Sequence, residues 1–231
     1  METNKLQTLD RGIVALRRVA DSAEGLSIAE LAAALGVHRA IAYRIVGTLE
    51  AHGMVHRRPD GRVMLGSGAL TLAAQFDGHL RGHARPLIEA LAEEARAAAF
   101  LSVAQGEECV AVLAAEPREA FLNINYRVGS RHPLNVGAAG IAILAGREPH
   151  PDDMEAVQRA RRQGYSVTRG ELQRGAVGLA SPVPLSRALH PGLECSVGVV
   201  AMEDLDIENA ASITMARAAD LARLMGKPEN S

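Results

Sequence analysis

Three consecutive segments near the start of the chain carry apolar side chains at the spacing of one helix face, which predicts three amphipathic helices. The first covers about residues 8–20 with Thr8 as its N-cap, the second begins after Ser27, and the third lies within residues 36–49. The side chains expected to face inward are Leu9, Ile13, Leu16 and Val19 or Ala20 in the first helix, Ile28, Leu31, Ala32 and Leu35 in the second, and Ala42, Ile45, Val46 and Leu49 in the third.

The second helix has recognisable start and stop signals. Ser27 and Glu30 have the spacing of a capping box, in which each side chain accepts a hydrogen bond from the other residue's backbone N–H. Gly36 follows the last apolar residue and can end a helix in the left-handed conformation. A short turn then leads into the third helix, and this arrangement is typical of a helix-turn-helix.

A β-hairpin is expected directly after the third helix, in the stretch "GMVHRRPDGRVMLG" at residues 53–66. Pro59 fixes its own φ, and Gly61 tolerates a positive φ, so "PDG" forms a turn between two short strands. Three helices followed by a hairpin predict a winged helix-turn-helix.

The outer face of the third helix is unusual because it combines cationic and small groups. In winged helix-turn-helix proteins this helix enters the major groove of DNA, while the hairpin approaches the backbone or the minor groove. Arginine can contact phosphates or guanine there. The candidate DNA-contacting residues are His38, Arg39, Ala40, Ile41, Arg44 and Thr48 on the helix and Arg57, Arg58 and Arg62 on the hairpin.

The distribution of charge supports a nucleic-acid interface. Residues 37–65 contain five arginines against Glu50 and Asp60, whereas the whole chain has a net charge of −2. A modest basic patch on an otherwise acidic chain is expected of a small nucleic-acid-binding module. On charge alone, a solvated charged face explains the pattern equally well.

The rest of the chain changes to a mixed helix and strand pattern. Connecting helices are expected at about 69–80 and 86–98, where Gly82 interrupts the first and Pro86 begins the second. Further helices are expected at about 137–145, 152–163 and 206–225. The expected strands are residues 100–105, 109–115, 121–129, 176–184 and 193–202. A sheet of five or six strands flanked by helices predicts an α+β domain large enough to enclose a small pocket.

Composition excludes several classes of protein. Of the 231 residues 48% are hydrophobic and only 3% aromatic, which disfavours single-stranded nucleic-acid binding by base stacking. No membrane span or secretion signal is evident, so a cytoplasmic protein is expected. Cys109 and Cys195 are expected to be reduced and buried.

No catalytic, phosphate-binding or dinucleotide motif is present, so neither an enzyme activity nor a cofactor is expected. His79 and His83 are four residues apart, but nothing else indicates a metal site.

The first part of the sequence resembles the IclR-type transcriptional regulators. The stretch "LSIAELAAALGVHRAIAYRIVGTLEAHGMV", from Leu26 to Val55, is similar to the family's helix-turn-helix pattern, and "RVMLGSGALTLA" continues the match. Relatives usually have Ser-Thr where this chain has Ala40 and Ile41. Without those hydroxyls Ile41 can contact a thymine methyl, so the operator sequence is expected to differ.

The resemblance extends to the second half. "VGSRHPLNVGAAGIAILA" at 128–145, "ELQRGAVGLASPV" at 171–183 and "CSVGVVAM" at 195–202 are similar to motifs of the family's GAF-like effector domain. The resemblance implies residues 1–66 as the winged helix-turn-helix domain, 67–82 as a linker helix and 83–231 as the effector-binding domain.

Candidate effector-binding residues lie at the start of the helix at 137–145. Ala138, Ala139 and Gly140 leave backbone N–H groups pointing at a ligand, and such a helix start favours an anion such as a carboxylate. Alternatively, these small residues only permit close packing of the helix on the sheet. The resemblance adds Thr168, Gly178, Ser196 and Gly198. Gly198 replaces a serine found in some relatives, which argues for a bulkier or less polar ligand. Glu171 is expected to accept hydrogen bonds from neighbouring backbone N–H groups.

The sequence as a whole predicts a ligand-responsive DNA-binding transcriptional regulator. By the resemblance it binds a palindromic operator in double-stranded DNA as a homodimer or tetramer, more often represses than activates, and controls adjacent catabolic genes. The effector is expected to be a small carboxylic or aromatic compound. The alternatives are a sensor or enzyme with a non-functional helix-turn-helix, or a redox- or zinc-sensing variant that uses Cys109, Cys195 and His132.

Overall fold

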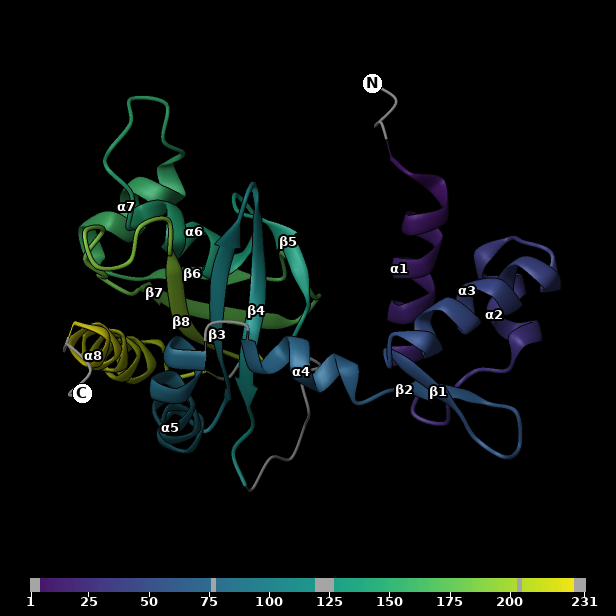
Figure 1. Cartoon of the computed structure of the whole chain (residues 1–231). Coiled ribbons are helices and arrows are strands. Elements are labelled where there is room, and N and C mark those ends of the chain that lie inside the picture. The colour runs from purple at the N-terminus through teal and green to yellow at the C-terminus, as the bar shows by residue number, and fades with distance from the viewer. Residues whose placement is uncertain (1–4, 76–77, 119–126, 203–204, 227–231) are drawn as a thin grey trace. The chain divides into compact units, whose positions relative to one another are not determined.

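A computed structural model of the chain describes residues 5–75, 78–118, 127–202 and 205–226 (Figure 1). The chain divides into two compact units, residues 1–78 and 79–231. Each unit has its own hydrophobic core. Within the described ranges, no helix is both long and apolar enough to cross a membrane.

The first unit is a winged helix. Helices α1 (Gln7–Ala20), α2 (Ile28–Leu35) and α3 (Arg39–Ala51) precede the antiparallel strands β1 (Val55–Arg57) and β2 (Val63–Leu65). Its core contains Ala15, Val19, Leu31, Ile45, Val46, Val55 and Val63. The capping box of α2 is present, since Glu30 N donates to Ser27 Oγ at 3.2 Å and Ser27 N to Glu30 Oε2 at 2.8 Å. Gly36 ends α2 with φ +61°.

The prediction that Leu9 and Ile13 of α1 face the core is wrong. Leu9 is 60% exposed and Ile13 46% exposed, whereas Ala15 and Val19 are buried. The unit's core includes residues of α1 only from the second half of the helix, so the first half has no core to bury its apolar side chains. The helix begins after Leu6, not after Thr8, and no side chain caps it.

The connecting helices also differ from the expectation. α4 (Gly68–Gln75) is followed by one continuous helix, α5 (Gly78–Ala95), which contains both Gly82 and Pro86. Proline normally breaks a helix because its ring meets the carbonyl of residue i−4 and its N–H is missing. Here residue i−4 is Gly82, whose lack of a side chain eases backbone adjustment. The same helix buries Leu80, Ala84, Ile88 and Leu91, and this packing outweighs the missing hydrogen bond.

The second unit is built on one six-stranded sheet in the order β5-β4-β3-β8-β7-β6, in which every pairing is antiparallel. The strands are β3 (Ala98–Gln105), β4 (Glu108–Ala115), β5 (Arg131–Pro133), β6 (Ser166–Arg169), β7 (Ala176–Pro182) and β8 (Cys195–Met202). The short strands β5 and β6 were not expected as strands. The strand expected at 121–129 falls largely outside the described residues.

Helices cover both faces of this sheet. α5 and α8 (Ile207–Met225) pack on one face, where Leu91, Leu101, Val199 and Leu221 belong to one buried cluster (Figure 1). α6 (Gly137–Ala145) packs on the other face, and α7 (Glu155–Gln163) packs against α6. The second unit is therefore an α+β domain with an antiparallel sheet, which confirms the expected fold class.

Candidate functional site

The exposed face of α3 brings together most of the helix residues expected to contact DNA. Arg39, Ala40, Ile41 and Arg44 are all exposed. Within the described part of the chain, neither Arg39 nor Arg44 has an ion pair, so both guanidinium groups are available to a partner. His38 instead caps the helix, because its Nδ1 accepts a hydrogen bond from Ala40 N at 3.3 Å.

Further along the helix, Thr48 is also exposed. Its hydroxyl donates to the backbone carbonyl of Arg44 at 3.0 Å. The hydroxyl oxygen retains its acceptor lone pairs for a further donor.

Arg57 on the wing is held inside the unit. Its guanidinium stacks over the ring of Tyr43 at 4.2 Å, and its Nε lies 3.4 Å from a carboxylate oxygen of Glu50. Both partners are on α3, so Arg57 fixes the wing against that helix. Tyr43 was missed as a candidate although it is 57% exposed; the signal was an aromatic residue on the polar face of a helix in a chain with few aromatics.

Arg62 is likewise occupied. It donates to the carbonyl of Gly25 at 2.9 Å and lies 3.7 Å from the carboxylate of Glu30, which ties β2 to the turn before α2. Arg58 is exposed and has only a loose contact with Asp60 at 3.7 Å. Among the arginines of the wing, Arg58 is thus the one directed to solvent.

A cavity of about 260 Å³ opens in the second unit, between the start of α6 and the sheet. Its wall is mostly apolar, with a few polar groups, which is typical of small-molecule sites. The residues that line it are Phe100, Ser130, Arg131, His132, Ala138, Ala139, Thr168, Glu171, Leu172, Gln173, Ala176, Gly178 and Val200.

Five of the eight expected effector-binding residues line this cavity: Ala138, Ala139, Thr168, Glu171 and Gly178. Sequence reasoning missed the wall formed by Phe100, Ser130, Arg131, Leu172, Gln173 and Ala176. These residues come from different strands and loops, and no pattern in the sequence shows that they converge.

Three expected residues have packing roles instead. Ser196 donates from its buried hydroxyl to the carbonyl of Ala139 at 3.0 Å, which fixes the start of α6. A Cβ on Gly140 would lie 2.4 Å from the carbonyl oxygen of Leu134, so Gly140 permits close contact between α6 and the preceding loop. For Gly140 the contact agrees with the packing alternative, and the role of Ser196 in effector binding stays a prediction.

Gly198 has a similar role beneath the cavity wall. A Cβ there would lie 2.4 Å from the carbonyl oxygen of Leu179 and 2.5 Å from Phe100 Cζ. Since Phe100 occupies the space above Gly198, this glycine permits close packing of the sheet, and the expectation of a bulkier or less polar ligand stays a prediction.

The start of α6 already holds a carboxylate. Glu171 Oε2 accepts a hydrogen bond from Gly137 N at 2.8 Å, as expected for Glu171. The first helical N–H groups carry a partial positive charge that favours an anion. Glu171 supplies that anion within the chain, so a ligand carboxylate would have to displace it from Gly137.

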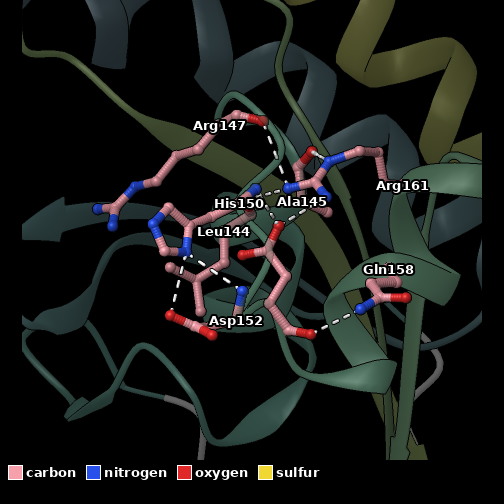
Figure 2. A network of polar contacts seen from close by, with 8 residues as sticks. Leu144, Ala145, Arg147, His150, Asp152, Gln158 and Arg161 are labelled. Atoms are coloured by element: carbon pink, nitrogen blue, oxygen red, sulfur yellow. Dashed lines mark hydrogen bonds and ion pairs between the residues drawn. The ribbon is translucent and has the colours of Figure 1, made fainter.

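The far end of α6 is held by a network of polar contacts (Figure 2). The guanidinium of Arg161, on α7, donates to the carbonyl oxygens of Ala145 at 3.1 Å, Leu144 at 3.3 Å and Arg147 at 3.4 Å (Figure 2). It also pairs with Asp153 at 2.8 Å. A helix end carries a partial negative charge and unpaired carbonyls, and this cation satisfies both.

The two cysteines do not form a redox or metal site with His132. Cys109 pairs in register with Ala104 and Cys195 with Val103, and neighbouring residues of a strand point to opposite faces. Cys109 and Cys195 therefore lie on opposite faces of the sheet, and both are buried. Burial raises the pKa of the Cys109 thiol to about 12, so it stays protonated and unreactive.

Comparison with known proteins gives consistent matches. Residues 8–59 match the family model of the IclR helix-turn-helix domain. The glycerol operon regulatory protein of Streptomyces griseus is 27% identical over 218 residues, which cover 84% of each chain. The transcriptional repressor IclR of Escherichia coli is 24% identical over 147 residues, covering 62% of this chain and 54% of that protein.

Among solved structures, an IclR homologue from Microbacterium hydrocarbonoxydans, complexed with 4-hydroxybenzoate, has a TM-score of 0.78 at 22% identity and covers 94% of this chain and 98% of that one.

A winged helix with exposed arginines on α3, joined in one chain to an α+β domain with a cavity, defines a DNA-binding transcriptional regulator. Regulators with this pairing of domains bind operator DNA. The chain carries an IclR helix-turn-helix domain at residues 8–59, and over most of its length it is similar to IclR-type transcriptional regulators. Members of this family are not enzymes, which agrees with the expectation from the sequence.

Proposed function

We propose that this regulator binds a palindromic operator through the exposed face of α3, with Arg39 and Arg44 as the main contacts and Arg58 on the backbone beside them. The observation that carries this proposal is that Arg39 and Arg44 are both exposed and without ion pairs in the described part of the chain. Arg57 and Arg62 hold the wing in position. The protein acts in the cytoplasm as a homodimer or tetramer, and it represses adjacent catabolic genes.

The test is a gel-shift experiment with DNA upstream of the gene itself and of its neighbours, at two salt concentrations. The double variant Arg39→Ala, Arg44→Ala should bind more weakly by about 1–3 kcal/mol for each base that an arginine no longer reaches, and its salt dependence should be shallower. The double variant Arg162→Ala, Arg169→Ala removes the same charge from two exposed positions of the second unit, and it should bind like the wild type. Wild-type affinity of the α3 variant would rule out this interface.

We further propose that the cavity at the start of α6 binds a small carboxylic or aromatic effector. Support comes from the apolar wall of Phe100, Val200 and Leu172 and from the guanidinium of Arg131 in the same cavity. Arg131 is held by Glu108 and by Gln105, each at 2.6 Å, and retains donors for an acid. The volume of about 260 Å³ suits a small molecule.

Thermal-shift screening of small carboxylic and aromatic acids tests the site, because a ligand that binds only the folded state raises the melting temperature. Stabilisation should disappear in Ala139→Trp, which fills the cavity, and in Leu172→Trp, a milder variant of a half-exposed residue. Leu193→Trp, in a second cavity lined by Pro184, Leu185 and Cys195, is the matched control. Equal stabilisation of all three variants would place the effector elsewhere.

We propose the domain limits 1–66, 67–82 and 83–231 for DNA binding, linker and effector binding. Whether the regulator represses or activates is measured by the expression of a reporter gene placed downstream of the bound operator. Deletion of the regulator should raise expression if it represses.

A further inference from the structure

His132 is one of the residues that line the cavity, and one of its ring nitrogens has no hydrogen-bond partner in the described part of the chain. The side chain is only 8% exposed, and its Nε2 is buried without a hydrogen-bond partner among the residues that the structure describes. Buried polar atoms are nearly always paired, so an unpaired one calls for a ligand or a water molecule.

The position of His132 follows from strand pairing. β5 pairs with β4, and His132 lies opposite Cys109, whose side chain belongs to the buried cluster beneath α6. Cross-strand partners share one face of a sheet, so His132 faces α6. Its Cε1 would lie 3.5 Å from a Cβ on Gly137, which places the ring against the start of that helix.

The hydrogen bond on the other ring nitrogen determines what Nε2 can do. Nδ1 lies 3.0 Å from the carbonyl oxygen of Pro133. A carbonyl only accepts, so Nδ1 carries the proton. In the neutral imidazole Nε2 is then an acceptor, and it requires a donor. A carboxylate has no proton to donate, whereas a hydroxyl group does.

The other polar groups near the start of α6 point to the same ligand chemistry. Glu171 is already bound to Gly137 N, so this region has a fixed negative charge and disfavours a second carboxylate. Thr168 also lines the cavity, and in the described ranges its hydroxyl has no hydrogen bond. Gly178 leaves space beside that hydroxyl, because a Cβ there would lie 3.4 Å from Thr168 Oγ1.

We propose that His132 is the specificity-determining residue of this cavity, and that its Nε2 accepts a hydrogen bond from a hydroxyl group of the effector. The effector is then a small hydroxylated molecule with an apolar body, and its hydroxyl lies at the α6 end of the cavity. Any carboxylate that it carries lies toward Arg131. This inference rests on the proposed effector site and names the chemistry that the site selects.

Four probes distinguish the proposed role of His132 from the proposed effector site as a whole. They are 4-hydroxybenzoate, 4-methylbenzoate, phenol and toluene. They combine the presence or absence of a carboxylate with a hydroxyl or a methyl group of similar size at one ring position. Binding to the full chain is measured by titration calorimetry. In the wild type each hydroxylated probe should bind about tenfold more tightly than its methyl counterpart, the gain expected of one net hydrogen bond in a buried site.

The tighter binding of hydroxylated probes should disappear in His132→Leu. It should survive in part in His132→Gln, whose amide keeps a polar atom at the ε position. His190→Leu is the matched control, because His190 lines the second cavity and its Nε2 contacts the carbonyl of Met225 at 3.0 Å. Circular dichroism checks that each variant is folded, and the comparison within the wild type needs no variant.

Equal binding of hydroxyl and methyl probes, or a preference that persists in His132→Leu, overturns the role of His132 and leaves the effector site standing. Failure of all four probes to bind overturns both the aromatic effector and the role of His132. A preference abolished only in His190→Leu assigns the ligand to the second cavity.

Discussion

Replacing Arg161 with alanine should destabilise the second unit far more than an ordinary removal of surface charge. The side chain is 23% exposed and donates to the carbonyls of Leu144, Ala145 and Arg147 while it pairs with Asp153. Two of the carbonyl contacts, at 3.3 and 3.4 Å, are long, so the contacts to Ala145 and Asp153 dominate.

Hydrogen bonds that involve a charged group contribute roughly 1.5–3 kcal/mol each. In the Arg161→Ala variant, water can form some of the lost hydrogen bonds because the site is partly exposed. The expected decrease in the free energy of unfolding is therefore about 2–4 kcal/mol. For a chain of this size each kilocalorie shifts the melting temperature by about 2–4 °C.

Arg159→Ala is the matched control on the same helix. Arg159 is exposed, and among the residues that the structure describes it has one ion pair, with Glu155 four residues earlier, at 2.7 Å. Such pairs contribute about 0.3–0.5 kcal/mol. Urea unfolding is followed by far-ultraviolet circular dichroism, since the protein has no tryptophan. Equal destabilisation by the two variants would refute the reasoning that Arg161 holds the end of α6.

Acid provides a second readout. The backbone N–H of His150, and then Arg161, lower the pKa of Asp153 below its usual range. A lowered pKa means that the ionised carboxylate stabilises the fold above its ordinary pKa and that this contribution is lost as the pH falls. The difference in stability between the wild type and Arg161→Ala should therefore narrow below about pH 4.

Three further predictions concern single positions. Gly198→Ala should cost about 1–3 kcal/mol, because the added Cβ meets the carbonyl oxygen of Leu179; an unchanged urea midpoint would contradict this. Ser27→Ala should cost about 1 kcal/mol because it removes the capping box with Glu30, measured as a lower melting temperature of the first unit. Cys109 should react with a thiol reagent at pH 8 only after denaturation, since its pKa is raised to about 12; rapid labelling of the native protein would show that the thiol is accessible.

The winged helix could be predicted in detail because its signals are local. The capping box at Ser27, the left-handed Gly36 and the turn at Gly61 each depend on residues a few positions apart, and all are present. The failures in this unit concern Leu9 and Ile13, where the spacing is correct for a helix face but the core does not extend along the whole helix.

In the second unit, the expectations that failed depend on contacts between distant residues. Pro86 was expected to begin a helix, but the burial of Leu80 and Ala84 before it carries the helix through. His132 was considered only with the cysteines, because its place in the cavity wall depends on the pairing of β5 with β4. Gly198 was assigned to the effector site through the family resemblance, and nothing in the sequence places Phe100 above it.

Glu171 has a consequence for which acids the regulator can sense. A carboxylate attached to the same chain, already bound to Gly137 N, competes with any free acid at an effective concentration of millimolar order or more. A metabolite that offered only a carboxylate to this helix end would be outcompeted at ordinary cellular levels. In the proposed effector site, the tethered side chain would therefore select against short-chain acids and favour molecules that also contact another part of the cavity.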